Sequence, residues 1–466
     1  MIFPLRFLLP LALFAVTPVL RAVDYPALFA ERVKSVVAVE FFTETELDRR
    51  PTIVSALVAD DRGTLVLPAA AINNYLPPEK LKDFRIYLPG RPVSEYSSGE
   101  YLGQDPLSGW HFVRVEEKLR DRLVPVTKFS ATGAVNTPAI GEEFWGIGLR
   151  GKDEDFAPYF MANRISLVQT MPERTAIALG ELAGPGLPVF AADGSFAGVA
   201  VGGFGQTFLQ YSRNDRGVPV MLINMEESSV FQLAADVGSW LARVPDNVSG
   251  RPIVWLGTFG LEPMDPEVAV FLKLADQSGC VVSEVLEGSP AESAGLRERD
   301  IILALDGKPL PRFKPDRVVV THFERELGFK KPGDVVTLTV LRGAERVEIK
   351  TTLAEQPKLF REAKRRYFET LGFTAREFVY GDGIARRVKL AGHKGVVAQF
   401  VKNSSPAGTA GLRPDDWIIE VDGVEVKTYE DAVQKLAAIE ADASRTDFVL
   451  LTSRNGETAV LRVKLK

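Results

Sequence analysis

Histidine, the side chain that most often performs acid–base catalysis, is scarce in this sequence. Its histidines number three: His111, His322 and His393. In the first half His111 stands alone, with Asp105 and Ser108 shortly before it. A serine, a histidine and an aspartate can form a catalytic triad, but they must converge from separate loops. These three fall on one turn and the start of one strand, where alternate side chains point to opposite faces. We therefore expect His111 to pack in a core.

Composition excludes several classes of site. The single cysteine, Cys280, rules out an intramolecular disulfide, and no Cys/His cluster has the spacing of a zinc site. The net charge of −5 and the pI of about 5.6 give no basic field for nucleic acid. We expect no metal or other cofactor, and a buried structural thiol at Cys280, which begins a mostly apolar strand.

Residues 1–22 have the pattern of a signal peptide. The apolar run from Phe7 to about Leu20 is short and is interrupted by Pro10 and Pro18, and the small residue Ala22 follows it. Such a run is too short to be a comfortable membrane span and is typical of a secretory signal. The sequence therefore predicts export, to the periplasm of a bacterium. An uncleaved membrane anchor is the alternative.

The chain of 466 residues predicts about three domains at about 150 residues each. From about residue 26 to about residue 211, short apolar stretches alternate with turn residues, which is typical of an all-β barrel or sandwich. The stretch from Glu226 to Ala242 has helical spacing, and residues 245–250 resemble a linker.

The second half contains an internal repeat. Residues 279–310 and 395–426 share a serine–proline pair, a glycine, an aspartate and an Asp-Gly pair at a constant offset. Each shared residue has a mechanical reason. The serine caps a short helix, the proline fits its first turn, the glycine ends it, and Asp-Gly makes a tight turn between strands. The repeat predicts two copies of a domain of roughly 100 residues.

This signature resembles that of bacterial PDZ domains. The resemblance places a peptide-binding loop upstream of each repeat, formed by Leu256, Gly257, Thr258 and Phe259 and by Leu371, Gly372, Phe373 and Thr374. In PDZ domains the N–H groups of this loop capture a C-terminal carboxylate, and the peptide adds as a strand to the sheet edge. The alternative is that Leu256 and Leu371 plug the groove and neither copy binds peptide.

The first half resembles the trypsin-like domain of the HtrA/Deg serine proteases at three places. Residues 103–115, GQDPLSGWHFVRV, resemble G-x-D-P-x-S-D-L-A-V-L-K-V, with Gly109 at the position of the triad aspartate. Residues 63–72, GTLVLPAAAI, resemble G-x-I-L-T-N-x-H-V-V, with Ala70 at the histidine position. Residues 183–190, AGPGLPVF, resemble G-N-S-G-G-P-L-V, with Pro185 at the serine position.

None of these three positions holds a group that can perform the chemistry. Alanine, glycine and proline supply no nucleophile, no base and no orienting carboxylate. Pro185 also lacks the backbone N–H that the nucleophile contributes to an oxyanion hole. Leu187 replaces the second glycine of the G-N-S-G-G-P pattern, and its side chain restricts the backbone there. We expect the protein to lack protease activity.

The resemblance implies a mainly β architecture, a trypsin-like double β-barrel followed by two PDZ domains, which are small, partly open α+β barrels. The expected boundaries are 1–22 for the signal peptide, 23–245 for the degenerate protease domain, 251–356 for the first PDZ domain and 366–466 for the second. Proteins of this family commonly form trimers or multiples of trimers, so the resemblance implies a homo-oligomer.

The favoured function is an exported pseudoprotease that binds peptides or C-termini of envelope proteins through its PDZ domains. It would act as a scaffold, a chaperone-like surface or the partner of an active protease. Two alternatives remain: an active envelope endopeptidase for misfolded proteins, and a purely structural PDZ scaffold. His322 is expected to be a solvated helix residue rather than a ligand contact. The basic run of Lys358, Arg361, Lys364, Arg365 and Arg366 is expected to be a solvated linker helix.

Overall fold

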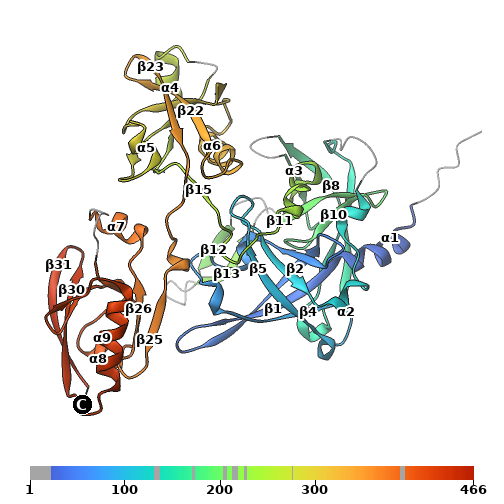
Figure 1. Ribbon diagram of the computed structural model, residues 1–466. Coiled ribbons are helices and arrows are strands. Elements are labelled where there is room, and N and C mark those ends of the chain that lie inside the picture. Colours follow the sequence, from blue (N-terminus) through green and yellow to red (C-terminus); the bar gives the residue numbers. More distant parts are fainter. Residues whose placement is uncertain are drawn as a thin grey trace, which may run out of the picture.

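A computed structural model describes residues 23–130, 137–170, 174–202, 207–211, 219–224, 228–274, 277–388 and 394–465. Two β-barrels form one body, and two smaller α+β domains lie beside it, the first at the top and the second at the lower left of Figure 1. The expected mainly β architecture, a trypsin-like double barrel followed by two PDZ domains, is confirmed. The predicted signal peptide and His393 lie outside the described residues.

The first barrel follows a short helix, α1 (Tyr25–Arg32), and closes in the order β1-β2-β3-β6-β5-β4. Its strands are β1 (Val36–Glu44), β2 (Arg49–Val58), β3 (Thr64–Leu67), β4 (Leu81–Tyr87), β5 (Ser97–Gln104) and β6 (His111–Val115). Short helical segments, α2 (Glu117–Arg120) and η5 (Val126–Phe129), lead on toward the second barrel. Aliphatic side chains and two stacked aromatic rings, Phe41 and Phe84, fill the barrel interior.

The second barrel closes in the order β10-β11-β14-β9-β8-β7. Its strands are β7 (Glu143–Leu149), β8 (Pro158–Gln169), β9 (Thr175–Leu179), β10 (Pro188–Ala191), β11 (Phe196–Gly202) and β14 (Ser228–Leu233). A separate hairpin joins β12 (Thr207–Tyr211) to β13 (Pro219–Asn224).

The helix predicted for residues 226–242 is largely wrong. Residues 228–233 form strand β14, which pairs with both β9 and β11. Its buried and partly buried side chains alternate because successive side chains of a strand point to opposite faces of the sheet. Helical turns follow only at α3 (Ala234–Val237) and η7 (Trp240–Ala242). In the sequence, apolar residues at positions 230, 233, 234 and 237 have helical spacing, whereas the strands that pair with β14 are formed by other parts of the chain.

An apolar seam joins the two barrels. Trp110 and Phe112 from the first barrel pack with Trp145, Leu187 and Phe190 from the second. Trp145 and Phe190 have their ring centroids 4.8 Å apart. Because both barrels bury side chains in this one cluster, the loops around the seam are held by the packing of both.

The first PDZ domain contains a sheet in the order β17-β18-β20-β22-β23 and two short two-stranded pairs. Its elements are β15 (Val254–Trp255), β16 (Thr258–Phe259), β17 (Glu262–Pro263), α4 (Pro266–Phe271), β18 (Cys280–Val281), β19 (Glu284–Val285), α5 (Pro290–Ser293), β20 (Ile301–Leu305), β21 (Lys308–Pro309), α6 (Val318–Gly328), β22 (Val335–Arg342), β23 (Glu345–Thr352) and β24 (Ala354–Glu355).

The second PDZ domain contains a sheet in the order β25-β26-β27-β28-β30-β31. Its elements are β25 (Arg365–Phe368), β26 (Phe373–Glu377), α7 (Tyr380–Arg386), β27 (Val396–Val401), α8 (Pro406–Thr409), β28 (Trp417–Val421), β29 (Val424–Glu425), α9 (Tyr429–Ala441), β30 (Asp447–Arg454) and β31 (Glu457–Lys464). The short η8 (Phe360–Glu362) precedes it.

The residues shared by the repeat act as the sequence predicts. Ser289 caps α5 by accepting from the Glu292 N–H at 3.1 Å, and Ser405 caps α8 in the same way. Gly295 and Gly411, which follow these helices, have φ of +79° and +95°, a region that favours glycine. The two PDZ domains therefore share their local turn chemistry.

Each PDZ domain also buries one shared aspartate. Asp416 accepts from the Nε and Nη2 atoms of Arg454, both at 2.6 Å, and from the Arg413 N–H at 2.9 Å. Asp300 has the same partners in the first copy, Arg342 and Arg297. A buried carboxylate is stable only when it is paired and hydrogen-bonded in this way.

We predict that Asp416→Ala lowers the free energy of unfolding of the second PDZ domain by about 2 kcal/mol, because Arg454 and the Arg413 N–H lose their acceptor. The matched control is Asp447→Ala, which removes the partner of the exposed Arg462 and should cost less than about 1 kcal/mol. Urea titration followed by hydrogen exchange in β28 and β30 measures both values. Equal costs for the two variants would contradict this role of Asp416.

Candidate functional site

The positions that the resemblance assigns to the triad aspartate and the triad histidine, here called the aspartate and histidine corners, lie side by side. Ala70 is in a single helical turn, Ala69–Ala71, directly after β3. Gly109 ends the turn between β5 and β6, with φ of +71°. A β-carbon built on Gly109 would lie 3.2 Å from the Ala69 Cβ. Two segments that are about 40 residues apart in the sequence thus meet where the resemblance places two triad members.

The serine corner reaches the same place from the second barrel. Pro185 lies in the loop before β10, and the next residue, Gly186, has φ of +79°. A β-carbon on Gly186 would lie 2.8 Å from the Pro68 Cδ. The segment from Pro68 to Ala70 therefore lies between the other two corners, and all three corners meet at the edge of the seam between the barrels.

The converged corners carry no catalytic group. Ala70 and Pro185 are exposed to solvent and Gly109 is partly exposed, so a substrate can reach these positions. Their side chains are a methyl group, a hydrogen and a saturated ring. None can donate or accept a proton, and none can attack a carbonyl carbon.

In the loop around Pro185, three backbone N–H groups donate hydrogen bonds to carbonyls of the protein itself. The Gly184 N–H donates to the Ile147 carbonyl at 3.2 Å, the Gly186 N–H to Ala200 at 2.7 Å and the Leu187 N–H to Gly184 at 3.0 Å. Leu187 is fully buried in the seam, which fixes this conformation. Residues 184–187 therefore offer no free N–H to a developing oxyanion.

His111, Asp105 and Ser108 do not form a second triad. Asp105 accepts from both the N–H and the Oγ of Ser108, at 2.9 and 2.8 Å, and pairs with Arg243. The Nδ1 atom of His111 instead lies 2.9 Å from the Tyr101 hydroxyl, and the histidine is 1% exposed. Burial lowers the pKa of His111 to about 4, so its imidazole is neutral near pH 7. The packing role predicted for His111 is the one that the structure gives it.

The linker between the PDZ domains reaches the aspartate corner. Arg361 is buried, and its Nη1 donates to the Gln104 Oε1 at 2.6 Å and its Nη2 to the Ser249 carbonyl at 2.9 Å. Gln104 in turn donates to the Gly109 carbonyl at 3.0 Å. The solvated linker helix predicted for residues 358–366 is wrong here, because an internal acceptor replaces water at Arg361 and strand β25 begins at Arg365. The charge pattern of the sequence held no signal for this contact.

The predicted peptide-binding loops occupy equivalent places in the two PDZ domains. Leu256 and Leu371 belong to the domain cores. Gly257 and Gly372 have φ of +90° and +77°, and a β-carbon on either would collide with the serine that caps the next helix, Ser289 or Ser405. Glycine is thus required by the fold of the loop itself.

The residues after these glycines differ between the copies. Phe259, two residues after the first glycine, is 57% exposed, whereas Phe373, directly after the second glycine, is fully buried. Thr374 is also buried, and its Oγ1 donates to the Glu46 Oε1 at 3.0 Å, at the tip of the β1–β2 hairpin. Thr258 pairs with Val285 at the edge of the first copy. The first loop is therefore open where the second is covered.

Burial describes the surroundings of two other candidate residues, His322 and Cys280. His322, on α6, is half-buried, with its ring centroid 5.2 Å from that of Phe313, and burial lowers its pKa. The residue lies on a helix, as predicted, and its side chain is only partly exposed to solvent. Cys280 is fully buried, as predicted, and burial raises the pKa of its thiol to about 12.

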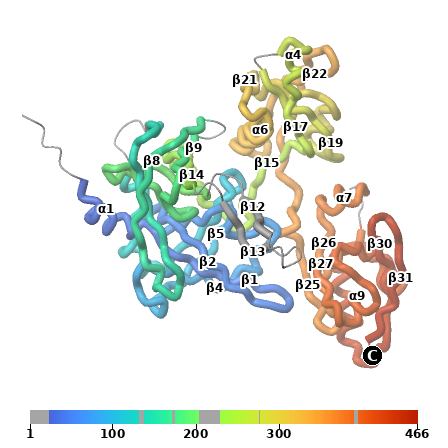
Figure 2. The backbone as a smooth tube through the Cα atoms, turned by 180° about the vertical axis from the view of Figure 1, so that it is seen from behind, coloured from blue at the N-terminus to red at the C-terminus, as the bar shows by residue number. Residues whose placement is uncertain are grey.

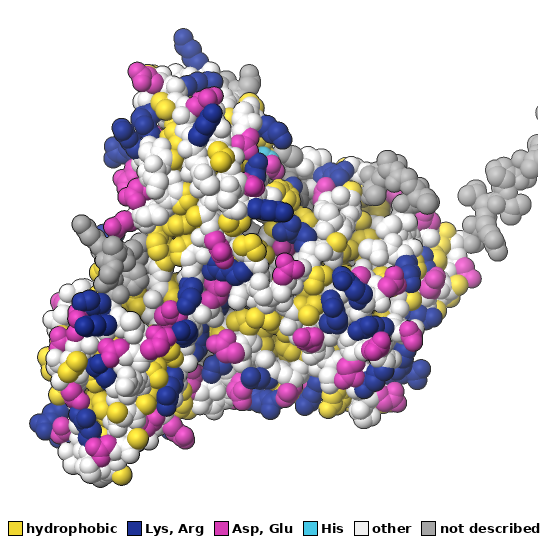
Figure 3. Space-filling model, in the orientation of Figure 1, with side chains coloured by type: hydrophobic (Ala, Val, Ile, Leu, Met, Phe, Trp, Pro, Cys, Tyr) yellow, Lys and Arg dark blue, Asp and Glu magenta, His cyan; other side chains and the backbone are white. Residues whose placement is uncertain are grey.

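Within the described ranges, no cluster of three or more histidine, cysteine, aspartate or glutamate side chains has the geometry to hold a metal ion. None of the described helices is long and apolar enough to cross a membrane. Basic and acidic side chains are interspersed over the face that Figure 3 shows.

Comparisons with known proteins agree with this architecture. Models of the PDZ domain match residues 259–353 and 401–446. A probable periplasmic DegP-like serine endoprotease of Chlamydia trachomatis is 30% identical over 197 residues, which cover 42% of this chain and 37% of that protein. The periplasmic pH-dependent serine endoprotease DegQ of Escherichia coli is 32% identical over 183 residues, 39% of this chain and 36% of that protein. The matches thus span less than two fifths of these relatives.

A form of the HtrA-type protease AlgW solved with a decapeptide shares the fold, with a TM-score of 0.50 and 15% identity over 72% of this chain and 98% of that one. The chain is therefore a protein with trypsin-like barrels and two PDZ domains, and it is similar in sequence to DegP-like periplasmic proteases.

We predict that His111 makes the free energy of unfolding decrease as the pH is lowered. The folded protein holds His111 neutral down to about pH 4, whereas the unfolded chain takes up a proton below about pH 6.5. Stability from this residue is complete above that value and is lost as the pH falls toward 4, by up to about 1.4 kcal/mol per pH unit. His111→Ala should show a flatter slope over this interval, measured by urea unfolding of the first barrel. Identical slopes for the two proteins would contradict a buried neutral imidazole.

Proposed function

We propose that the protein is an exported pseudoprotease of the HtrA type that binds peptides or protein C-termini through its PDZ region. Its barrel domain serves as a scaffold, as a chaperone-like surface or as the regulatory partner of an active protease. The periplasmic relatives support the export that residues 1–22 predict. The proposed assembly is a homo-oligomer, a trimer by resemblance.

One observation carries the proposal. The three corners that the resemblance marks for catalysis do converge, yet the residues found there are Ala70, Gly109 and Pro185. Convergence argues that these positions are aligned correctly with the family pattern. The loss of all three groups, with Leu187 packed into the seam, then argues against hydrolysis.

The rival function is that of an active envelope endopeptidase. The names of the relatives favour it, since they are serine endoproteases. It requires a nucleophile and a base elsewhere in the chain. Ser108 is the serine nearest the site in sequence, and its Oγ donates to Asp105 rather than to a histidine.

We predict that the purified chain neither cleaves unfolded casein nor reacts with a serine-directed fluorophosphonate probe above a buffer control. The reason is that Ser108, the described serine beside Gly109, donates its hydroxyl to an aspartate that is held by Arg243, and not to a histidine. An active trypsin-fold protease, tested in parallel, serves as the positive control. Labelling of a serine that mass spectrometry can locate, Ser108 for instance, is the outcome that overturns the pseudoprotease.

Restoring the triad alone should not restore activity. We predict that the combined variant Ala70→His, Gly109→Asp and Pro185→Ser shows at most trace cleavage of casein. The variant regains one backbone N–H at residue 185, but the buried Leu187 still holds the loop in a conformation in which the N–H groups of residues 184, 186 and 187 donate to carbonyls of the protein. The loss of one such donor costs about 100- to 1000-fold in kcat. A second variant that adds Leu187→Gly tests the cause, since it removes the side chain that holds the loop. Robust cleavage by the three-residue variant would show that the loop is already competent.

A further inference from the structure

The two PDZ domains use the strand before the peptide-binding loop in different ways. In the first domain, β15 pairs with β24, and the carbonyl of Ile253 accepts from the Gln356 N–H at 2.8 Å. Strand β16, after the loop, pairs with β19 alone among the described strands. Its other edge is therefore left for a chain that adds from outside.

In the second domain the strand before the loop pairs with the strand after it. Residues 366, 367 and 368 of β25 lie opposite Ala375, Thr374 and Phe373 of β26. Strand β26 pairs with β27 on its other side, so β25 forms the outer edge of the sheet. The edge that is open in the first domain is thus closed in the second.

The closing strand runs along the helix that borders this edge. Helix α9 lies near both β25 and β26. Just before β25, Lys364 pairs with Glu430 at the first turn of α9, at 2.5 Å. Just after it, the Thr370 N–H donates at 2.9 Å to Glu440, at the last turn. Residues 364–370 therefore follow α9 from its start to its end while pairing with β26, as a peptide that adds to this edge would.

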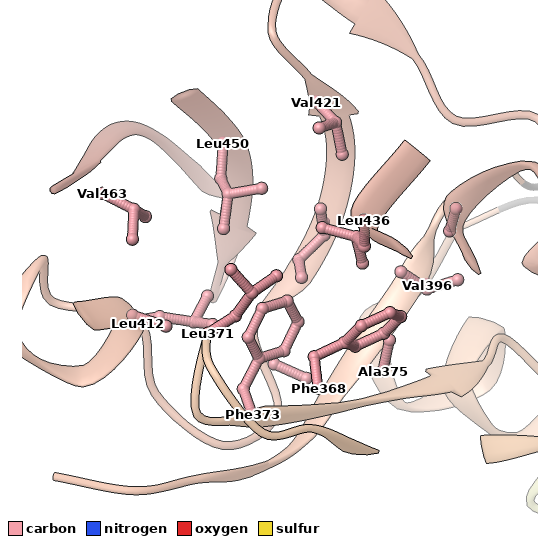
Figure 4. Packing of buried hydrophobic residues seen from close by; sticks show 14 of the residues in the cluster. Phe368, Leu371, Phe373, Ala375, Val396, Leu412, Val421, Leu436, Leu450 and Val463 are labelled. Atoms are coloured by element: carbon pink, nitrogen blue, oxygen red, sulfur yellow. The ribbon is translucent and has the colours of Figure 1, made fainter. Parts of the chain in front are cut away.

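The last residue of β25 also supplies a hydrogen-bond acceptor to the loop that captures a carboxylate in PDZ domains. The Gly372 N–H donates to the Phe368 carbonyl at 2.7 Å. The Phe368 side chain is fully buried and packs with Leu371, Phe373 and the α9 residue Leu436, as Figure 4 shows. An apolar side chain and a terminal oxygen acceptor are the two features that a PDZ groove recognises in a C-terminus.

We propose that residues 364–368 occupy the peptide groove of the second PDZ domain in cis, so that the first PDZ domain is the one that takes a peptide ligand in trans. The assignment of the ligand to the first domain rests on the proposed function. Occupation of the second groove rests on the pairing and packing of β25 by themselves.

The short connection and one further contact favour the occupied state. A segment joined to its groove by four residues has an effective concentration in the millimolar range or above, which a free peptide must exceed. Strand β25 is also held from outside, because Arg365 lies 3.5 Å from Glu79 of the first barrel. Figure 2 shows the chain descending from the first PDZ domain into this position beside the barrels.

The test combines hydrogen exchange with peptide binding on the chain from residue 23 to residue 466. The probe is the pentapeptide Lys-Arg-Arg-Tyr-Phe with a free carboxylate, which copies residues 364–368, and its C-terminal amide is the control. In the wild type we expect residues 364–368 to exchange slowly without peptide. We expect the probe to slow exchange in residues 256–262 and to leave residues 371–377 unchanged.

The matched variants are Phe368→Ala and Tyr367→Ala. Phe368 fills the groove, whereas Tyr367 points to the opposite face, with its ring centroid 6.0 Å from that of Phe400. We expect Phe368→Ala to speed exchange of residues 364–368 at least tenfold and to create probe binding at residues 371–377, at least tenfold tighter than in the wild type. Tyr367→Ala should match the wild type in both measurements.

Probe-induced slowing at residues 371–377 in the wild type would overturn the proposal, as would fast exchange of residues 364–368. A folded Phe368→Ala that neither loosens this segment nor binds probe would overturn it too. If Phe368→Ala fails to fold, the wild-type measurements still decide. A third outcome separates the two parts of the proposal: the probe binds at residues 371–377 in Phe368→Ala but never at residues 256–262. That outcome would refute peptide binding by the first domain and support occupation of the second groove in the wild type.

Discussion

The packing of Leu187 into the seam between the barrels is the constraint on which the site depends. Complete burial of a leucine contributes about 1.5–3 kcal/mol relative to exposure, so the loop that carries it has a strong reason to keep its shape. That shape turns the N–H groups of Gly184, Gly186 and Leu187 toward carbonyls of the protein. The residue that packs between the barrels thus also keeps these three N–H groups from donating to a developing oxyanion.

A second constraint comes from the turn that holds the aspartate corner. Asp105 anchors this turn to Arg243, and Gln104 accepts from Arg361 of the linker. Leu107 lies against the end of α6, where a β-carbon on Gly328 would come within 2.8 Å of its Cδ1. In this chain the turn joins the barrels, the first PDZ domain and the linker, which gives it a structural task independent of any carboxylate at Gly109.

The architecture could be predicted from the sequence because its signals are local. Both PDZ domains are indicated by the same short pattern: a helix-capping serine, a proline, a glycine and an Asp-Gly turn. The barrels are indicated by short apolar stretches that alternate with turn residues. The helix expected over residues 226–242 failed because β14 is shaped by partners far away in the chain. The buried Arg361 and the pairing of β25 could not be predicted either. Both depend on distant segments, which provide the hydrogen-bond acceptors of Arg361 and the sheet edge that β25 joins. A basic run in the sequence does not indicate such partners.

The pairing of β25 with β26 bears on valency. Two PDZ domains in one chain suggest a bivalent binder, whose two grooves reinforce each other through the linker between them. With β25 already paired to β26, the groove edge that stays open among the described PDZ strands is the one at β16. Under the proposed function, strong binding of a partner with several tails then requires several copies of the chain to come together, so that self-association, rather than the number of PDZ domains, sets how strongly such a partner is held.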